Sequence, residues 1–133
     1  MKHEELTREI IAAFYQVYNC LGYGFLERVY EQAMMIELKN RGLTVHQQAP
    51  IHVFYQTEQV GEYFADLLIE NAVIAELKAA EAISEKHEAQ LLNYLKATNI
   101  EIGFVFNFGP KAEFTRKVYS NKPKSFQNPR QCA

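Results

Sequence analysis

The stretch that decides the fold is YFADLLIENAVIAELK, residues 63–78. It contains two runs of branched and apolar residues around Glu70-Asn71, a pair that is typical of turns. We therefore predict two neighbouring strands of an antiparallel meander. Since side chains alternate along a strand, Glu76 and Lys78 should share one face of the sheet while Leu77 faces the other.

The length of the turn decides whether the acidic residues converge. A two-residue turn, Glu70-Asn71, would send Glu76 to the face opposite Asp66, because side chains alternate with period two. A three-residue turn that includes Ala72 pairs Asp66 directly with Glu76. Asn71 tolerates the left-handed conformation that such a turn often needs. We therefore predict the three-residue turn or an equivalent bulge.

Asp66 and Glu76 would then form an acidic centre. A lone carboxylate is costly to bury unless it is paired or bound to a metal, and two neighbouring carboxylates repel each other. A hard divalent cation relieves that repulsion, which predicts Mg²⁺ or Mn²⁺. Lys78 beside them would help activate water and stabilise charge on a phosphoryl oxygen. Spacing alone leaves open an exposed cross-strand ion pair of Lys78 with either acid.

Outward from this stretch, helical and extended patterns follow one another. Apolar residues recur every three or four positions over 6–21, and again from Leu26 to Arg41-Gly42, which predicts two helices. Ser84 is typical of an N-cap and predicts a third helix through about Thr98. Strands are predicted at Thr44–Gln48, Ile51–Tyr55, Tyr63–Ile69, Val73–Leu77, Ile102–Phe108 and Phe114–Tyr119, with turns at Ala49-Pro50 and Thr57–Gly61. This order predicts a mixed sheet with helices against it.

The bulk composition is that of one domain. A chain of 133 residues with 48% hydrophobic content can build one core and is too short for two ordinary domains. Cys20 and Cys132 lie far apart without a CxxC pair, so neither a disulfide framework nor a thiolate zinc site is indicated. The N-terminus is charged and no apolar run approaches the roughly 20 residues that span a bilayer, so we expect a cytoplasmic protein without membrane contact.

The charge is unevenly distributed. A formal net charge of -2 gives no general reason to expect nucleic acid, which is bound mainly through Lys and Arg. Residues 1–110 hold 8 basic and 15 acidic side chains, whereas residues 111–133 hold 6 basic and 1 acidic. The basic C-terminal tail from about residue 111 is therefore either a phosphate-contacting strip or a solvated terminus.

Three segments together resemble a known family. Asp66, nine further residues and then Glu76-Leu77-Lys78 resemble the signature of the PD-(D/E)XK nuclease superfamily, although Ala65 stands where its named Pro would be. GFLERVY, residues 24–30, resembles the motif of the small GxxExxY family within it, with Gly24, Glu27 and Tyr30 at the named positions. HEAQLLNYL, residues 87–95, resembles that family's next helix, with Gln90 and Tyr94 four apart.

The resemblance implies a restriction-endonuclease-like αβββαβ core, an α/β fold, in a single domain over 1–133. It implies a metal held by Asp66, Glu76, Glu27 and the Leu77 carbonyl. Among the remaining site residues, it implies Lys78 as the catalytic base-like residue, Gln90 beside it, and Tyr94 and Tyr30 on the substrate side.

Ordinary structural roles compete with three of these assignments. With Gly24 as N-cap, Glu27 would fall at N3 and serve only the helix terminus. The stripe of His87, Gln90 and Tyr94 would be the wet side of its helix, with His87 at the surface or capping.

The leading functional hypothesis is a Mg²⁺-dependent nuclease that hydrolyses phosphodiester bonds, with DNA as the expected nucleic acid. The alternative is a non-catalytic module of the same fold that binds a protein or nucleic acid, which the acidic balance of the chain favours. A homodimer would suit a small domain that grips a long polymer.

Overall fold

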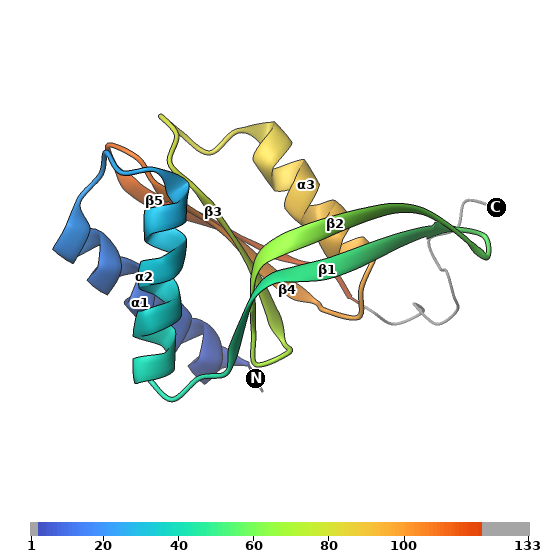
Figure 1. Cartoon of the computed structure of the whole chain (residues 1–133), viewed down its shortest axis with the longest axis horizontal. Coiled ribbons are helices and arrows are strands. Elements are labelled where there is room, and N and C mark those ends of the chain that lie inside the picture. The colour runs from blue at the N-terminus through green and yellow to red at the C-terminus, as the bar shows by residue number, and fades with distance from the viewer. Residues whose placement is uncertain (1–2, 121–133) are drawn as a thin grey trace.

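A five-stranded sheet of order β1-β2-β3-β4-β5 organises the chain (Figure 1). The structure, a computed structural model, describes residues 3–120. The elements are α1 (Glu4–Leu21), α2 (Glu27–Asn40), β1 (Val45–Tyr55), β2 (Glu58–Ile69), β3 (Val73–Lys78), α3 (Glu85–Lys96), β4 (Ile102–Phe108) and β5 (Ala112–Val118). Because β3 and β4 run parallel while the other neighbours are antiparallel, the sheet is mixed, as predicted.

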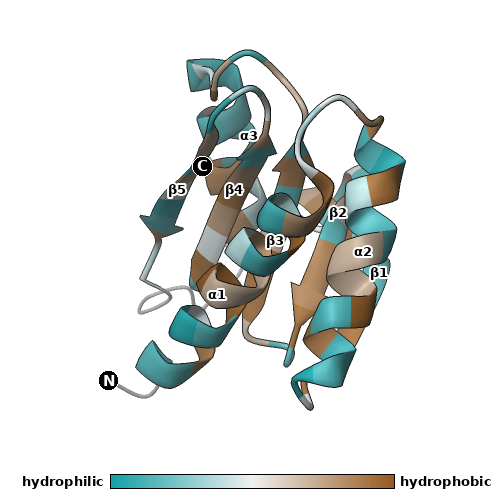
Figure 2. Ribbon diagram, turned by 90° about the vertical axis from the view of Figure 1, so that its left-hand side faces the viewer, coloured by the Kyte–Doolittle hydropathy of each residue, from teal (hydrophilic) through white to brown (hydrophobic). Residues whose placement is uncertain are grey.

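Helices cover both faces of the sheet. α1 and α2 pack on one face, where Phe14 and Met34 join Leu77 and Phe104 in a buried apolar cluster. α3 packs on the other face, where Leu91 lies in a second cluster. β4 is buried along its whole length, as its apolar sequence predicts, and Figure 2 shows hydrophobic residues through the centre of the sheet. None of the helices within residues 3–120 is long and apolar enough to cross a membrane.

The turn between β2 and β3 has the predicted three residues. Ile69 pairs with Val73, and Leu67 with Ala75, so Glu70, Asn71 and Ala72 form the connection. Glu70 and Asn71 have φ values of 55° and 53°, and the Glu70 carboxylate accepts a hydrogen bond of 2.6 Å from the backbone N–H of Thr44. This register sets Asp66 opposite Glu76 at the next position along.

β1 and β2 depart from the prediction. The predicted turn at Ala49-Pro50 is wrong, because β1 continues through it as one strand paired with β2. β1 is an edge strand, and a proline without an N–H is tolerated where one side of the strand has no neighbour. The predicted turn over Thr57–Gly61 is also too long, since β2 begins at Glu58.

The β1–β2 hairpin projects beyond the rest of the sheet. β2 pairs with β3 only as far as Leu67, while β1 and β2 stay paired out to Tyr55 and Glu58. We call the projecting part, residues 49–65, the hairpin arm; Figure 1 shows it extending from the body past α3. β2 and β3 therefore diverge in a fork, and Asp66 lies at its base.

The ends of the chain differ from expectation in one respect. The predicted edge strand is present as β5, which begins at Ala112, two residues earlier than predicted. The basic segment predicted from about residue 111 therefore starts as a sheet strand. The remainder of the predicted tail, from 121 onward, lies outside the described residues.

Tyr30 holds the connection between α1 and α2. Its side chain is fully buried and stacks on Phe108 with ring centroids 4.3 Å apart. Its hydroxyl donates to the carbonyl of Gly22 at 2.7 Å and accepts from the N–H of Phe25 at 3.2 Å. The expectation that Tyr30 contacts substrate is therefore wrong for this conformation, because neither its ring nor its hydroxyl is accessible.

We predict that Tyr30→Phe lowers the free energy of unfolding by about 1–2 kcal/mol, because the Gly22 carbonyl and the Phe25 N–H both lose a partner. Urea unfolding followed by circular dichroism measures this loss. Tyr23→Phe is the matched control, since the Tyr23 side chain is 61% exposed. Equal stabilities of the two variants would contradict the assigned role.

Candidate metal centre

Two carboxylates bridge the fork between β2 and β3. The backbone N–H of Asp66 donates to Oε2 of Glu76 at 2.9 Å, and the N–H of Leu77 donates to Oδ2 of Asp66 at 2.8 Å. Each acid thus bonds to the backbone of the other strand just beyond the last ladder pair, Leu67 with Ala75. The two carboxylates take over the role of ladder hydrogen bonds where the strands part. Their positions are fixed by the backbone itself.

Burial favours the neutral, protonated forms of both acids. Burial, and then the nearby charge of Asp66, raise the pKa of Glu76 to about 8. Burial also raises the pKa of Asp66 above its usual range, against the hydrogen bond from the Leu77 N–H. Glu76 is only 4% exposed, so the predicted alternative of an exposed ion pair with Lys78 is wrong. The site disfavours two negative charges unless a cation joins them.

The donor atoms fit a hard cation. Oε1 of Glu76 has no hydrogen-bond partner among residues 3–120, and Oδ1 of Asp66 accepts only a 3.3 Å bond from Gln48 there. Each acid thus keeps an oxygen that the backbone does not use, and oxygen donors suit Mg²⁺ or Mn²⁺. Over the same residues, no three Asp, Glu, His or Cys side chains are already grouped as metal ligands. A third ligand would have to turn toward the pair.

Lys78 lies on the same face as Glu76. Leu77 between them points into the cluster beneath α1 and α2, as strand alternation predicts. Within residues 3–120, Lys78 forms no ion pair with Asp66 or Glu76, although its charge counteracts the burial that raises both pKa values. Its ammonium is thus close enough to act on the acids electrostatically.

A buried asparagine fixes the chain just after Lys78. Asn107 is fully buried, and its side chain accepts from the Ala80 N–H at 2.9 Å and donates to the Ala80 carbonyl at 3.0 Å. At Gly109 a Cβ would lie 1.9 Å from the Ala80 oxygen, so only glycine fits. The sequence pattern predicts this segment only as the end of a strand. The signal for its role was a polar residue in an otherwise apolar strand.

α2 brings two glutamates toward the fork. α2 begins after N-cap Leu26, so Glu27 is its first residue and the N3 capping role is wrong. Oε2 of Glu27 accepts from the N–H of Ala79 at 3.3 Å, next to Lys78. Glu31, one turn later, was missed; after burial, its charge contributes to raising the pKa of both Asp66 and Glu76. The i, i+4 spacing from Glu27 was the signal that could have found it.

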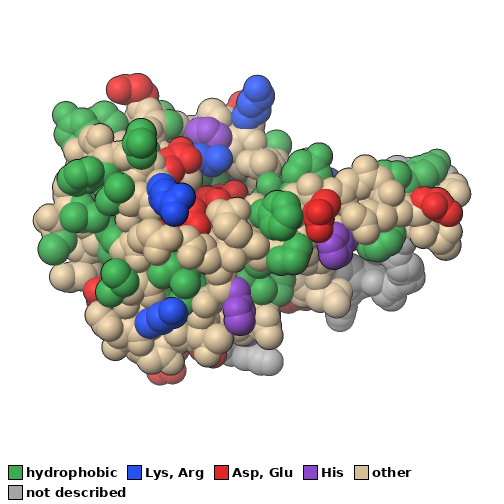
Figure 3. Space-filling view, in the orientation of Figure 1, with side chains coloured by type: hydrophobic (Ala, Val, Ile, Leu, Met, Phe, Trp, Pro, Cys, Tyr) green, Lys and Arg blue, Asp and Glu red, His purple; other side chains and the backbone are tan. Residues whose placement is uncertain are grey.

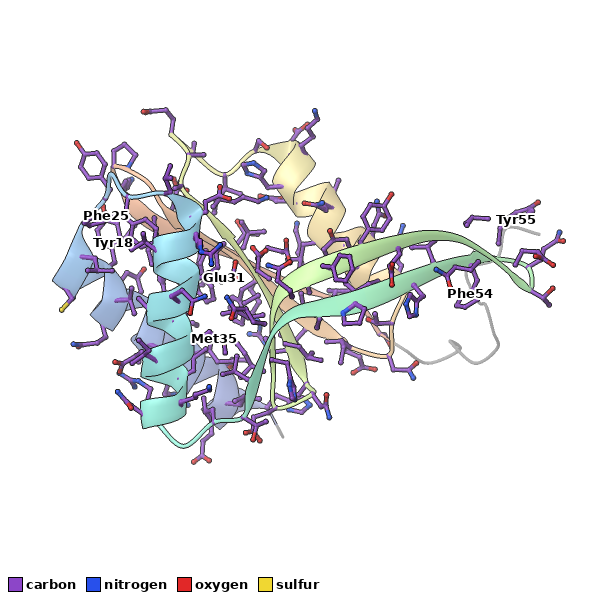
Figure 4. The ribbon with its side chains drawn as sticks, in the orientation of Figure 1. Tyr18, Phe25, Glu31, Met35, Phe54 and Tyr55 are labelled. Atoms are coloured by element: carbon purple, nitrogen blue, oxygen red, sulfur yellow. The ribbon has the colours of Figure 1, made fainter. Side chains whose placement is uncertain are left out.

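Gln48 connects Glu31 to the acidic pair. Its amide nitrogen donates to Oε2 of Glu31 at 3.1 Å and to Oδ1 of Asp66 at 3.3 Å, while Gln47 donates to Glu31 at 2.6 Å. Gln48 has a φ of 53°, an uncommon conformation for a residue other than glycine. Such backbone conformations persist where surrounding contacts hold them, and they cluster at functional sites. Figure 4 shows Glu31 on α2, facing the base of the hairpin.

α3 presents Gln90 and Tyr94 to the same face. Tyr94 is 6% exposed, so its expected place on the wet side of the helix is wrong. Burial, and then the charges of Glu76 and Asp66, raise the pKa of Tyr94 to about 12, which keeps its hydroxyl a neutral donor. Gln90 donates to that hydroxyl at 3.0 Å. His87 caps the helix through reciprocal bonds with Ser84, as its capping interpretation predicted.

Figure 3 shows the side chains around the fork on one face of the molecule, where acidic side chains lie recessed beside basic and histidine side chains. The residues brought together are Asp66, Glu76, Lys78, Glu27, Glu31, Gln48, Gln90 and Tyr94.

Comparison with known proteins supports the fold. The family model described as "PD-(D/E)XK nuclease superfamily" matches residues 4–118. The solved structure titled "Crystal structure of SSO0001" is similar with a TM-score of 0.56 and 18% identity, over 90% of this chain. This chain spans 61% of the length of that one, and at such identity the likeness shows the fold alone. No curated protein matches the sequence significantly.

We predict that Glu76→Gln removes a pH dependence of stability in metal-free protein. Between the ordinary glutamate pKa of 4.5 and the folded value of about 8, the folded chain binds a proton that the unfolded chain lacks. Stability should therefore fall as pH rises through this window, by on the order of 5 kcal/mol, and the neutral amide of the variant would remove that loss. Urea unfolding in EDTA across the window measures it.

Glu81→Gln is the control, because Glu81 is an exposed carboxylate near the same strand end. Parallel pH profiles of wild type and Glu76→Gln would contradict the assigned burial effect.

Proposed function

The chain belongs to the PD-(D/E)XK nuclease superfamily, and we propose that it is a metal-dependent nuclease that hydrolyses phosphodiester bonds in nucleic acid. The observation that carries the proposal is the buried pair Asp66 and Glu76, bonded across the fork with Lys78 on the same face. The sequence motif of Gly24, Glu27 and Tyr30 further supports membership of the GxxExxY family.

Asp66 and Glu76 are the proposed metal ligands, with the Leu77 carbonyl and Glu27 completing the set. Glu27 lies within reach because its carboxylate already meets the backbone at Ala79. A bound Mg²⁺ or Mn²⁺ would neutralise the acids and act as a Lewis acid toward the phosphodiester and water.

The remaining side chains have distinct proposed roles. Lys78 would orient the attacking water and stabilise negative charge on a phosphoryl oxygen. Tyr94, a neutral phenol, would donate its hydroxyl proton in a hydrogen bond to another phosphate oxygen. Gln90 holds that hydroxyl through its 3.0 Å bond and leaves its own carbonyl oxygen to accept from water. DNA is the substrate proposed first.

We predict that the protein binds Mn²⁺ at one site and that Asp66→Asn weakens this affinity by about tenfold or more, because Asn lacks the ligand charge. Isothermal titration calorimetry measures both affinities. Glu27→Gln and Glu31→Gln, compared side by side, decide which glutamate of α2 supports the metal. Negligible heats for the wild type and Asp66→Asn alike would refute the site.

We predict that Lys78→Ala lowers kcat for Mg²⁺-dependent cleavage by about 10²–10³-fold while Mn²⁺ affinity persists, since Lys78 acts on water and phosphate. Gel assays on single-stranded DNA, duplex DNA and RNA measure turnover, with Lys39→Ala as a control on the last turn of α2. Undiminished cleavage by Lys78→Ala would remove that residue from the mechanism. Metal binding by a wild type that cuts none of these substrates would favour the non-catalytic module.

A further inference from the structure

A groove of about 1020 Å³ runs between the hairpin arm and α3. One wall consists of residues 52–57 with Val60 and Tyr63, and the other is the exposed side of α3 around Asn93. Figure 1 shows these two elements lying alongside each other, with the arm reaching past the helix. None of the roles assigned above uses this groove beyond its end at Gln90 and Tyr94.

The groove differs in charge from the rest of the molecule. The chain holds 16 acidic and 14 basic side chains, so acids are the more common. Of the residues within 3–120 that line the groove, Lys86 and Lys96 are lysines and none is Asp or Glu. This lining favours an anionic ligand even though the chain as a whole is acidic.

The groove also carries exposed aromatic rings. Phe54, Tyr55 and Tyr63 are 48%, 48% and 49% exposed, and all three line it. Figure 4 shows Phe54 and Tyr55 near the tip of the arm. Rings left half-exposed beside lysines are the combination by which proteins bind single-stranded nucleic acid, stacking bases while cations contact phosphates.

The groove leads directly to the candidate metal centre. Gln90 and Tyr94 line its inner end, and the Tyr94 ring lies 5.9 Å from that of Tyr63. The hydroxyl of Tyr94 lies on the side of Glu76 and Asp66, whose charges act on it. A polymer stacked along the arm would therefore continue toward the acidic pair.

We propose that this groove binds an unpaired stretch of single-stranded nucleic acid, stacking its bases on Tyr63, Phe54 and Tyr55 with Lys86 facing the phosphates. The proposal rests on the proposed nuclease function, since it names the substrate class of the same site. A duplex keeps its base faces stacked within the helix, so it offers nothing to these rings. Stacking reads no particular base, so the binding is sequence-tolerant.

Binding of labelled oligo-dT and oligo-U of about 15 nucleotides, measured by fluorescence anisotropy in EDTA, tests the proposal without cleavage. Tyr63→Ala should weaken binding of the preferred strand about tenfold, the effect of losing one base–aromatic stack. Phe64→Ala is the matched control, because Phe64 is the next residue, is 47% exposed and lies outside the groove lining. It should change the affinity by less than about twofold.

Lys86→Gln should reduce the slope of log affinity against log salt by about 0.7, the value for one phosphate contact on a single strand. Lys39→Gln, on α2 and away from the groove, should leave the slope unchanged. Phe54→Ala provides a second aromatic variant on the arm and should lower affinity in the same direction as Tyr63→Ala.

Equal oligonucleotide affinities of Tyr63→Ala and Phe64→Ala would overturn the proposal that the groove binds single strands. Tighter binding of duplex than of single strand would overturn it as well. Self-association lost in Tyr63→Ala with unchanged oligonucleotide affinity would assign the groove to a second copy of the chain and overturn the proposal. Cleavage in Mg²⁺ is scored separately. A wild type that cuts duplex but binds no single strand would support the nuclease function and overturn single-strand binding in the groove. Single-strand binding that depends on Tyr63, without any cleavage, would support the groove and overturn the nuclease function.

Discussion

The rest of the site depends on one reciprocal arrangement, in which Asp66 and Glu76 each bond to the backbone of the other's strand. Two strands cannot diverge inside a protein without leaving backbone N–H groups unpaired, and such groups are costly when buried. The carboxylates supply the missing acceptors. The acids therefore satisfy the backbone where the strands part and also place two carboxyl groups at the base of the fork, where burial raises both pKa values.

This arrangement draws on both layers of the core. The face of β3 that carries Leu77 is anchored beneath α1 and α2, and the face that carries Glu76 is covered by α3. Tyr30 and Asn107 then hold the two connections nearest the fork, one between the first two helices and one after Lys78. Neither Tyr30 nor Asn107 bonds to the acidic oxygens, yet each limits where the backbone can place them. A functional group on such rigid supports needs little reorganisation to act.

The sequence predicted the parts of the site that obey local periodicity. Period-two alternation and turn length sufficed to pair Asp66 with Glu76, because a one-residue change would have moved every side chain to the other face. Gln48 could not be predicted, since a positive φ is unfavourable for a residue other than glycine. Its partners Glu31 and Asp66 are also distant in sequence. Tyr30 was misassigned because a motif identifies a residue without indicating whether it faces the core or the solvent.

Tyr94 lies between the proposed substrate groove and the acidic centre. Its ring lies in the groove beside Tyr63, and its hydroxyl, fixed by Gln90, is within the influence of Glu76. The ring and hydroxyl of Tyr94 belong to one rigid side chain, and this ring lies 5.9 Å from that of Tyr63. A base stacked on Tyr63 would therefore hold its own phosphate at a set distance from the Tyr94 hydroxyl. Under the proposed function, stacking would then position the scissile phosphate without any base-specific contact. Under the same proposal, positioning by stacking alone would let the chain act on nucleic acid without a base-reading element.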